Sequence, residues 1–243
     1  MTPRHEVVFL FDVDNTLLDN DAAQADYHAH LVQQSGPAAA ERYWTLFLEL
    51  REELGYSDYL GALQRYRLER LHDPHLLMVS AYLLDYPFVQ RLYPGALDVL
   101  AHFGRGAPVV VLSDGDVVFQ PRKVQRSGIG RAVDDRVLIY VHKEQEMDEV
   151  ECRYPADHYV LVDDKLRILA AVKEFWGPRV TTVFVHQGHY AHDPAILAAY
   201  PPADLRVERI GDLLHYDTPM LLGAATSVSG ARRDTHEPHS TTP

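Results

Sequence analysis

The sequence predicts an α/β fold in which a mostly parallel sheet carries helices on both faces. Short apolar runs rich in valine recur along the chain, and helical patterns lie between them. The runs are apolar throughout, as in strands that are buried on both faces. They span Val7–Phe11, Val109–Leu112, Tyr159–Val162 and Val180–Val185. A further run, Val137–Val141, either pairs at a sheet edge or leads into a loop.

Only helical patterns separate the first apolar run from the second, so a block of helices is inserted there. Glycine and proline punctuate this block, which predicts helices over 21–33, 37–54, 59–71 and 74–84. Further helices are predicted over 96–103 and 167–176. We therefore divide the chain into a core (1–18 and 93–222), a helical insertion (19–92) and an unstructured tail. The tail, 223–243, is small, polar and proline-containing.

The charge and hydropathy of the chain exclude several classes of partner. The formal net charge of the 243 residues is −12, which argues against binding to nucleic acid or to an anionic membrane. No apolar run approaches the roughly 20 residues needed to cross a bilayer. We expect a cytoplasmic protein with no membrane or nucleic-acid partner. The sequence does not indicate its oligomeric state.

Two carboxylates stand where the first predicted strand ends. Asp12 and Asp14 follow the run Val7–Phe11, and a buried strand has no packing use for them. Side chains at positions i and i+2 of a strand point the same way, so the two should emerge together and could hold a cation. The alternative is an ordinary turn, with Asn15 as a turn former and Thr16 as a helix cap.

Other strands of the predicted sheet also end in polar residues. Ser113 to Asp116 follow the second run, Asp163 and Asp164 follow the third, and Lys143 follows the run that begins at Val137. In open parallel sheets, ligands sit outside the carboxyl ends of the strands. Carboxylates, a hard cation, a lysine and a hydroxyl are what phosphoryl transfer requires. The sequence therefore indicates a phosphoryl-transfer site at this edge.

Four short motifs resemble those of the haloacid-dehalogenase-like (HAD) hydrolases. Phe-Asp-Val-Asp-Asn-Thr-Leu at 11–17 resembles their first motif, and Leu-Ser-Asp-Gly at 112–115 resembles the second. Lys143 matches the third, and Val-Asp-Asp at 162–164 matches the fourth. Tyr-Pro-Gly at 93–95 is similar to the point where such chains re-enter the core. The resemblance implies a Rossmann-like core with a helical cap inserted between the first two motifs.

The resemblance also implies catalytic roles. Asp12 would be the nucleophile that forms an aspartyl-phosphate. Asp14 would be the general acid and then the base that activates water, and Lys143 would steady the nucleophile and the phosphate. Ser113 would bind a phosphoryl oxygen, and Asp114 lies in the same phosphate-binding loop.

A Mg²⁺ ion is the cofactor that the resemblance implies. The Asp12 carboxylate, the Asp14 backbone carbonyl and Asp164 would hold it, with Asp163 as a further ligand or a supporting neighbour. Position 15 departs from the family because it is Asn where Gly is common, but Asn also tolerates left-handed backbone geometry.

Two other signals compete for a role in the site. Lys123 is a rival to Lys143, but it falls in a predicted helix directly after the second motif. His186, His189 and His192 follow a predicted strand, but their spacing suits no compact metal site. We interpret them as a surface loop that could contact substrate.

We expect a Mg²⁺-dependent phosphatase that acts on a small phosphorylated substrate. A phosphomutase with the same aspartyl-phosphate is an alternative. A dehalogenase needs neither Mg²⁺ nor an acid at position 14, so Asp14 counts against it. A non-catalytic binding module on the same scaffold is a further alternative, against which the complete set of motif residues argues.

Overall fold

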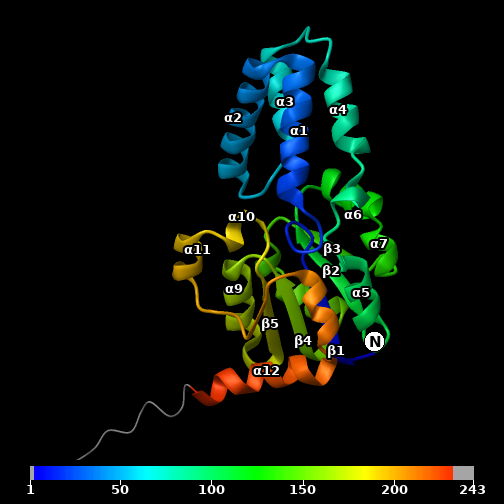
Figure 1. The fold of residues 1–243 in the computed structure, drawn as a ribbon, viewed down its shortest axis with the longest axis vertical. Coiled ribbons are helices and arrows are strands. Elements are labelled where there is room, and N and C mark those ends of the chain that lie inside the picture. The colour runs from blue at the N-terminus through cyan, green and yellow to red at the C-terminus, as the bar shows by residue number, and fades with distance from the viewer. Residues whose placement is uncertain (1–2, 232–243) are drawn as a thin grey trace, which may run out of the picture.

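The computed structural model describes residues 3–231 and contains one six-stranded sheet (Figure 1). All the strand pairs are parallel, in the order β3-β2-β1-β4-β5-β6. The strands are β1 (His5–Phe11), β2 (Val109–Asp114), β3 (Val137–Tyr140), β4 (Ala156–Asp163), β5 (Val180–Val185) and β6 (Leu205–Val207). The predicted α/β fold is confirmed, and β3 lies at one edge. The sequence did not predict β6, the short strand at the other edge.

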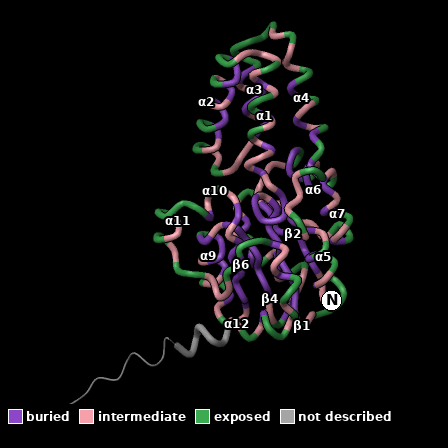
Figure 2. Tube along the Cα trace, in the orientation of Figure 1, coloured by how far each residue is buried: buried purple, intermediate pink, exposed green. Residues whose placement is uncertain are grey.

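Alternate residues of each strand enter one of two apolar cores, because strand side chains alternate between faces. Val7, Phe9 and Phe11 of β1 belong to one core, whereas Val8 and Leu10 belong to the other. The first core includes α5 (Ala96–Gly104), α6 (Phe119–Ser127) and α7 (Ile129–Ala132). The second includes α8 (Met147–Arg153) and α9 (Leu166–Trp176). Burial is therefore concentrated along the strands (Figure 2).

Four helices inserted between β1 and β2 form an elongated bundle beyond one end of the sheet (Figure 1). They are α1 (Asn20–Ser35), α2 (Pro37–Leu54), α3 (Tyr59–Glu69) and α4 (Leu76–Asp85). Buried aromatic rings fill the bundle; Tyr27 and Tyr43 meet edge-on with centroids 5.2 Å apart. The ring of Tyr59 lies 4.9 Å from that of Phe119 in α6, so the same packing attaches the insertion to the core.

The remaining elements are short and connect the helices and strands already described. The 3₁₀ turns are η1 (Phe88–Arg91), η2 (Lys143–Gln145), η3 (Gly177–Arg179) and η4 (Ile210–His215), and the short helices α10 (Gly188–Ala191) and α11 (Pro194–Ala199) follow β5.

Helix α12 (Thr218–Ala231) differs from the prediction, because the backbone is helical beyond Gly223, where the tail was expected to start. The rest of the predicted tail, 232–243, lies outside the described residues. Each helix in the described part is too short or too polar to cross a bilayer.

A left-handed residue shapes the loop that follows β1. Asn15 has φ 61°, a conformation that few residues other than Gly adopt easily. Its side-chain oxygen accepts hydrogen bonds from the backbone N–H groups of Asn20 (3.0 Å) and Asp21 (3.2 Å), where α1 begins. At Gly188 of α10, an added Cβ would lie 2.4 Å from the Asn15 Cβ. Asn15 therefore connects the loop, the first cap helix and α10.

Replacing Asn15 separates the contribution of its backbone geometry from that of its hydrogen bonds. Both Asn15→Gly and Asn15→Ala remove the side-chain acceptor, but only alanine is strained at positive φ. We expect the alanine variant to have a free energy of unfolding about 1 kcal/mol lower than the glycine variant. Urea denaturation of the two variants measures this difference. Equal stabilities would show that the loop relaxes out of the left-handed conformation.

Candidate active site

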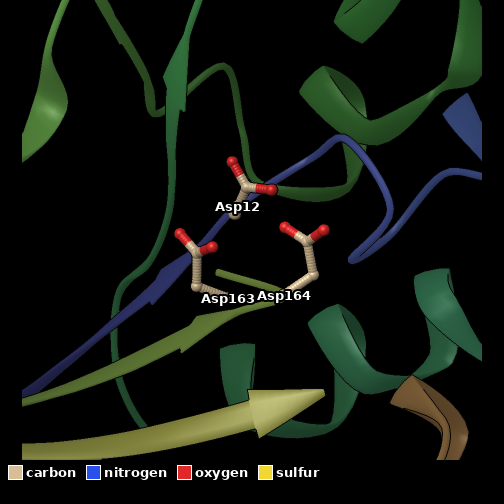
Figure 3. A group of neighbouring side chains, drawn as sticks. All are labelled: Asp12, Asp163 and Asp164. Carbon is tan, nitrogen blue, oxygen red and sulfur yellow. The ribbon is translucent and has the colours of Figure 1, made fainter. Parts of the chain in front are cut away.

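Three aspartates from two neighbouring strands meet at the carboxyl edge of the sheet (Figure 3). Phe11 of β1 pairs with Val162 of β4, so the residues that follow them, Asp12 and Asp163, emerge side by side. One carboxylate oxygen from each of Asp12, Asp163 and Asp164 lies within 4.8 Å of the others, and all three residues are buried. The aspartates of the first and fourth motifs are thus close enough to share one ion.

Lys143 provides the positive charge that this buried group needs. Its Nζ lies 2.6 Å from Oδ1 of Asp12 and 2.7 Å from Oδ2 of Asp163, and it donates to the Leu112 carbonyl oxygen at 3.2 Å. Burial alone would lower the pKa of Lys143, but the neighbouring carboxylates, chiefly Asp12 and Asp163, raise it above its usual value. Lys143 is therefore a cation fixed between two acids.

The backbone of Lys143 is held by Asp114, at the end of β2. The Asp114 Oδ1 atom accepts a hydrogen bond from the Lys143 N–H at 2.7 Å, across the β2–β3 pair. The structure does not test the predicted place of Asp114 in the phosphate-binding loop, which stays a prediction. The hydrogen bond shows that Asp114 fixes the turn that carries Lys143.

The consecutive residues Asp163 and Asp164 differ in their contacts. Asp163 accepts from the backbone N–H of Lys165 at 2.8 Å and faces Lys143. Both side-chain oxygens of Asp164 are buried and, among residues 3–224, find no hydrogen-bond donor. Burial raises the pKa of both carboxyl groups above the usual range. A buried carboxylate without a donor fits a cation ligand, because a cation would satisfy it.

Asp14 is bound by Lys123, the lysine that competes with Lys143 for a role in the site. Lys123 Nζ lies 2.6 Å and 2.8 Å from the two Asp14 oxygens and donates to Oδ1 of Asn20 at 3.0 Å. Lys123 is 1% exposed. The two lysines are therefore divided between the two aspartates of the first motif: Lys143 contacts Asp12, and Lys123 contacts Asp14.

Ser113 lies at the end of β2 and is buried. Its Oγ accepts from Gln120 Nε2 at 2.9 Å, and the same amide lies 3.4 Å from Oδ2 of Asp14. The sequence patterns did not indicate a role for Gln120, nor the hydrogen bond that Thr16 donates to Oδ2 of Asp12 at 3.2 Å. The available signal was the i, i+3 spacing of Gln120 and Lys123 at the start of α6, which places both on one helix face.

A cavity of about 580 Å³ lies between the cap and this edge of the core. The lining residues of the core include Asp14, Asp114 and Lys165. In the sequence, each lies within two residues of Asp12, Ser113 or Asp164. The cap contributes a single stretch around the end of α2. The lining of the cavity comprises Asp14, Arg51, Gly55, Tyr56, Ser57, Tyr59, Asp114, Gly115, Gln120, His142, Glu144, Gln145, Lys165, Leu166, Arg167, Tyr190, Ile196 and Tyr200.

The three histidines after β5 do not gather into a site. His189 Nδ1 pairs with Oδ1 of Asp21 at 2.7 Å, whereas His186 Nδ1 faces Glu208 at 2.8 Å. The His192 ring packs against that of His186, with centroids 4.3 Å apart. In the part of the chain that the structure describes, no group of three potential metal ligands includes a histidine. His189 instead joins this loop to the start of α1.

Comparisons with known proteins agree with this geometry. The family model of the haloacid dehalogenase-like hydrolases matches residues 9–184. A solved structure assigned to the same class, from Burkholderia xenovorans LB400, is 61% identical, with a TM-score of 0.84 over 88% of this chain and 100% of that one. A search of curated proteins found no match.

Two more distant structures share the fold. The HAD-hydrolase YfnB from Bacillus subtilis, solved with bound magnesium, is 16% identical (TM-score 0.56; 88% of this chain and 98% of that one). The L-2-haloacid dehalogenase from Xanthobacter autotrophicus is 18% identical (TM-score 0.58; 86% and 96%). The extent of the family match and the aspartate cluster agree: this chain belongs to the haloacid dehalogenase-like hydrolases and is an enzyme of that class.

Proposed function

We propose that the enzyme is a Mg²⁺-dependent phosphatase acting on a small phosphorylated metabolite. The observation that carries this proposal is the buried Asp164 carboxylate, which finds no donor among residues 3–224 and lies beside Asp12. Such a carboxylate suits a divalent cation, and a cation would offset the repulsion between a phosphate and the Asp12 carboxylate. The cavity volume of about 580 Å³ lies in the range of sites for small molecules.

The donor set fits a hard cation, because every candidate ligand is an oxygen. Asp12 and Asp164 would hold Mg²⁺ through their carboxylates and Asp14 through its backbone carbonyl. Asp163, which already faces Lys143 and the Lys165 N–H, would support them. When bound, the ion would supply charge neutralisation at the phosphoryl oxygens.

In the proposed reaction, an oxygen of Asp12 attacks phosphorus and the bond to the ester oxygen breaks. Lys143, already 2.6 Å from Asp12, neutralises charge on the transferring group, and Ser113 orients it. Asp14 donates a proton to the departing oxygen and then takes one from the water that hydrolyses the aspartyl-phosphate. Asp14 lines the cavity, and Lys123 and Gln120 position its carboxylate.

The same site favours phosphate over halogenated substrates. Displacement of halide from carbon needs no cation and no proton for the leaving group. In this chain, by contrast, Asp164 finds no donor among residues 3–224, and Asp14 lies at the cavity wall. A phosphomutase would use the same aspartyl-phosphate but return the phosphoryl group to an organic acceptor. Release of inorganic phosphate distinguishes the two.

Removing the nucleophile tests the proposal most directly. In Asp12→Asn, the amide cannot form the aspartyl-phosphate, so phosphate release from phenyl phosphate with Mg²⁺ should fall by at least about 10³-fold. Mass spectrometry of acid-quenched wild-type enzyme should find a phosphoryl group on the peptide that contains Asp12. Asp98→Asn, an exposed aspartate on α5, is the matched control and should keep its rate. Equal rates in wild type and Asp12→Asn would refute the mechanism.

Mg²⁺ should stabilise the protein more at high pH than at low pH. The raised pKa of the Asp164 carboxyl means that the folded state holds protons more tightly than the unfolded state. Without metal, stability is therefore lost as the pH rises above about 3.8, the ordinary value, and a bound cation would restore it. The rise in Tm on adding Mg²⁺ should be larger at pH 8 than at pH 5, by differential scanning fluorimetry.

Asp164→Asn controls for this effect, because the amide removes both the titration and the ligand charge. The variant should show little Mg²⁺-dependent change in Tm at either pH. A shift in Tm that is independent of pH, or one that survives in Asp164→Asn, would show that the ion binds elsewhere.

A further inference from the structure

Six side chains that carry a formal charge line the cavity between cap and core, and four of them have partners. The acidic residues are Asp14, Asp114 and Glu144, and the basic residues are Arg51, Lys165 and Arg167. Lys123 binds Asp14, the Lys143 N–H binds Asp114, and Arg167 is ion-paired with Glu144. The N–H group satisfies Asp114 without neutralising its charge, whereas Asp14 and Glu144 are each paired with a cation. Two cations of the wall have no hydrogen-bond or ion-pair partner among residues 3–224.

Arg51 and Lys165 are these two cations. Among residues 3–224, neither side chain forms a hydrogen bond or an ion pair. Arg51 lies in the last turn of α2 in the cap, and Lys165 directly follows Asp164 in the core. The charges of Asp164 and Asp12 attract Lys165 although they do not form an ion pair with it. Arg51 is therefore the cation of the cavity wall that is best placed to bind an anion from outside, in a chain with a net charge of −12.

Tyr190 of α10 brings the two cations together. The Arg51 Cζ lies 5.7 Å and the Lys165 Nζ 5.6 Å from the centroid of the Tyr190 ring. All three residues line the cavity, and Figure 1 shows α10 below the lower end of α2. A compact molecule in the cavity can therefore reach the core cation and the cap cation at once.

We propose that the substrate carries a second anionic group, a carboxylate or a further phosphate, and that Arg51 of the cap binds it. The inference rests on the proposed phosphatase function and adds a substrate class to it. The planar guanidinium matches both kinds of anion through paired N–H donors, and among residues 3–224 none of these donors meets a protein acceptor. Lys165, which directly follows Asp164 in the sequence, adds positive charge to the same cavity wall.

A purely structural role is the alternative for Arg51. Its contact with the Tyr190 ring could hold the cap against the core, in which case a substitution would affect every substrate alike. The two roles are separated by a preference ratio, which is kcat/KM for a substrate with the second anion divided by kcat/KM for a matched substrate without it. This ratio depends on Arg51 only if Arg51 binds the second anion.

The experiment compares kcat/KM within matched pairs of phosphate esters. In the first arm the second anion is a carboxylate: phenyl phosphate is paired with 4-carboxyphenyl phosphate, and glycerol 3-phosphate with 3-phosphoglycerate. In the second arm it is a phosphate: fructose 6-phosphate is paired with fructose 1,6-bisphosphate. Wild type should prefer the member with the extra anion. Arg51→Gln should lower the preference ratio by roughly 10- to 100-fold, as expected for loss of a charge-assisted contact. Arg51→Lys should retain part of it.

Arg42→Gln is the matched control, because Arg42 lies on the same helix but pairs with Glu69 and does not line the cavity. It should leave the preference ratio unchanged. The two arms show whether the second anion is a carboxylate or a phosphate, and either result supports the proposal. No preference in wild type, or a ratio unaffected by Arg51→Gln, would overturn it while leaving the phosphatase function intact. If no ester, phenyl phosphate included, released phosphate, the proposed function would fail and this inference with it.

Discussion

The buried contact of the Lys143 ammonium with Asp12 and Asp163 is the interaction on which the site depends. Isolated charges of either sign are costly in a protein interior, and removing one partner from such a group costs about 3–5 kcal/mol. The contact forms only if β1 lies between β2 and β4, because Phe11 must align with Val111 on one side and Val162 on the other. The order of the strands therefore determines which charged side chains meet at the carboxyl edge of the sheet.

The division of labour between Asp163 and Asp164 follows from the same constraint. Asp163, the last residue of β4, faces Lys143, and the backbone N–H of Lys165 fixes its other oxygen. Asp164, one residue further along, turns its carboxylate to where no donor is found among residues 3–224. Two adjacent aspartates thus differ in their surroundings: one completes an internal ion pair, and the other is the carboxylate to which the proposed function assigns a cation.

Sequence patterns predicted the parts of the fold and site that depend on local order. Valine-rich runs marked the central strands, glycine and proline marked the cap helices, and the carboxyl-edge rule brought Asp12 and Asp164 together. Long-range side-chain contacts left no such pattern. The contact of Lys123 with Asp14 joins residues far apart in the sequence, and the role of Asp114 depends on the orientation of one turn. Strand β6 and the helical backbone of α12 after Gly223 were missed because a short edge strand and a run of small residues give weak periodic signals.

An acidic enzyme that accepts an anionic substrate must gather positive charge where the substrate sits. Most cations near this cavity are already paired with carboxylates: Lys143 with Asp12 and Asp163, Lys123 with Asp14, and Arg167 with Glu144. They therefore leave little net positive charge for a substrate that is itself an anion. On the proposed function, the missing charge comes from a metal ion at Asp164 and from Arg51 and Lys165. The ion and Lys165 belong to the core, whereas Arg51 belongs to the cap. The core would then recognise what every substrate shares, and the cap would recognise what distinguishes one substrate from another.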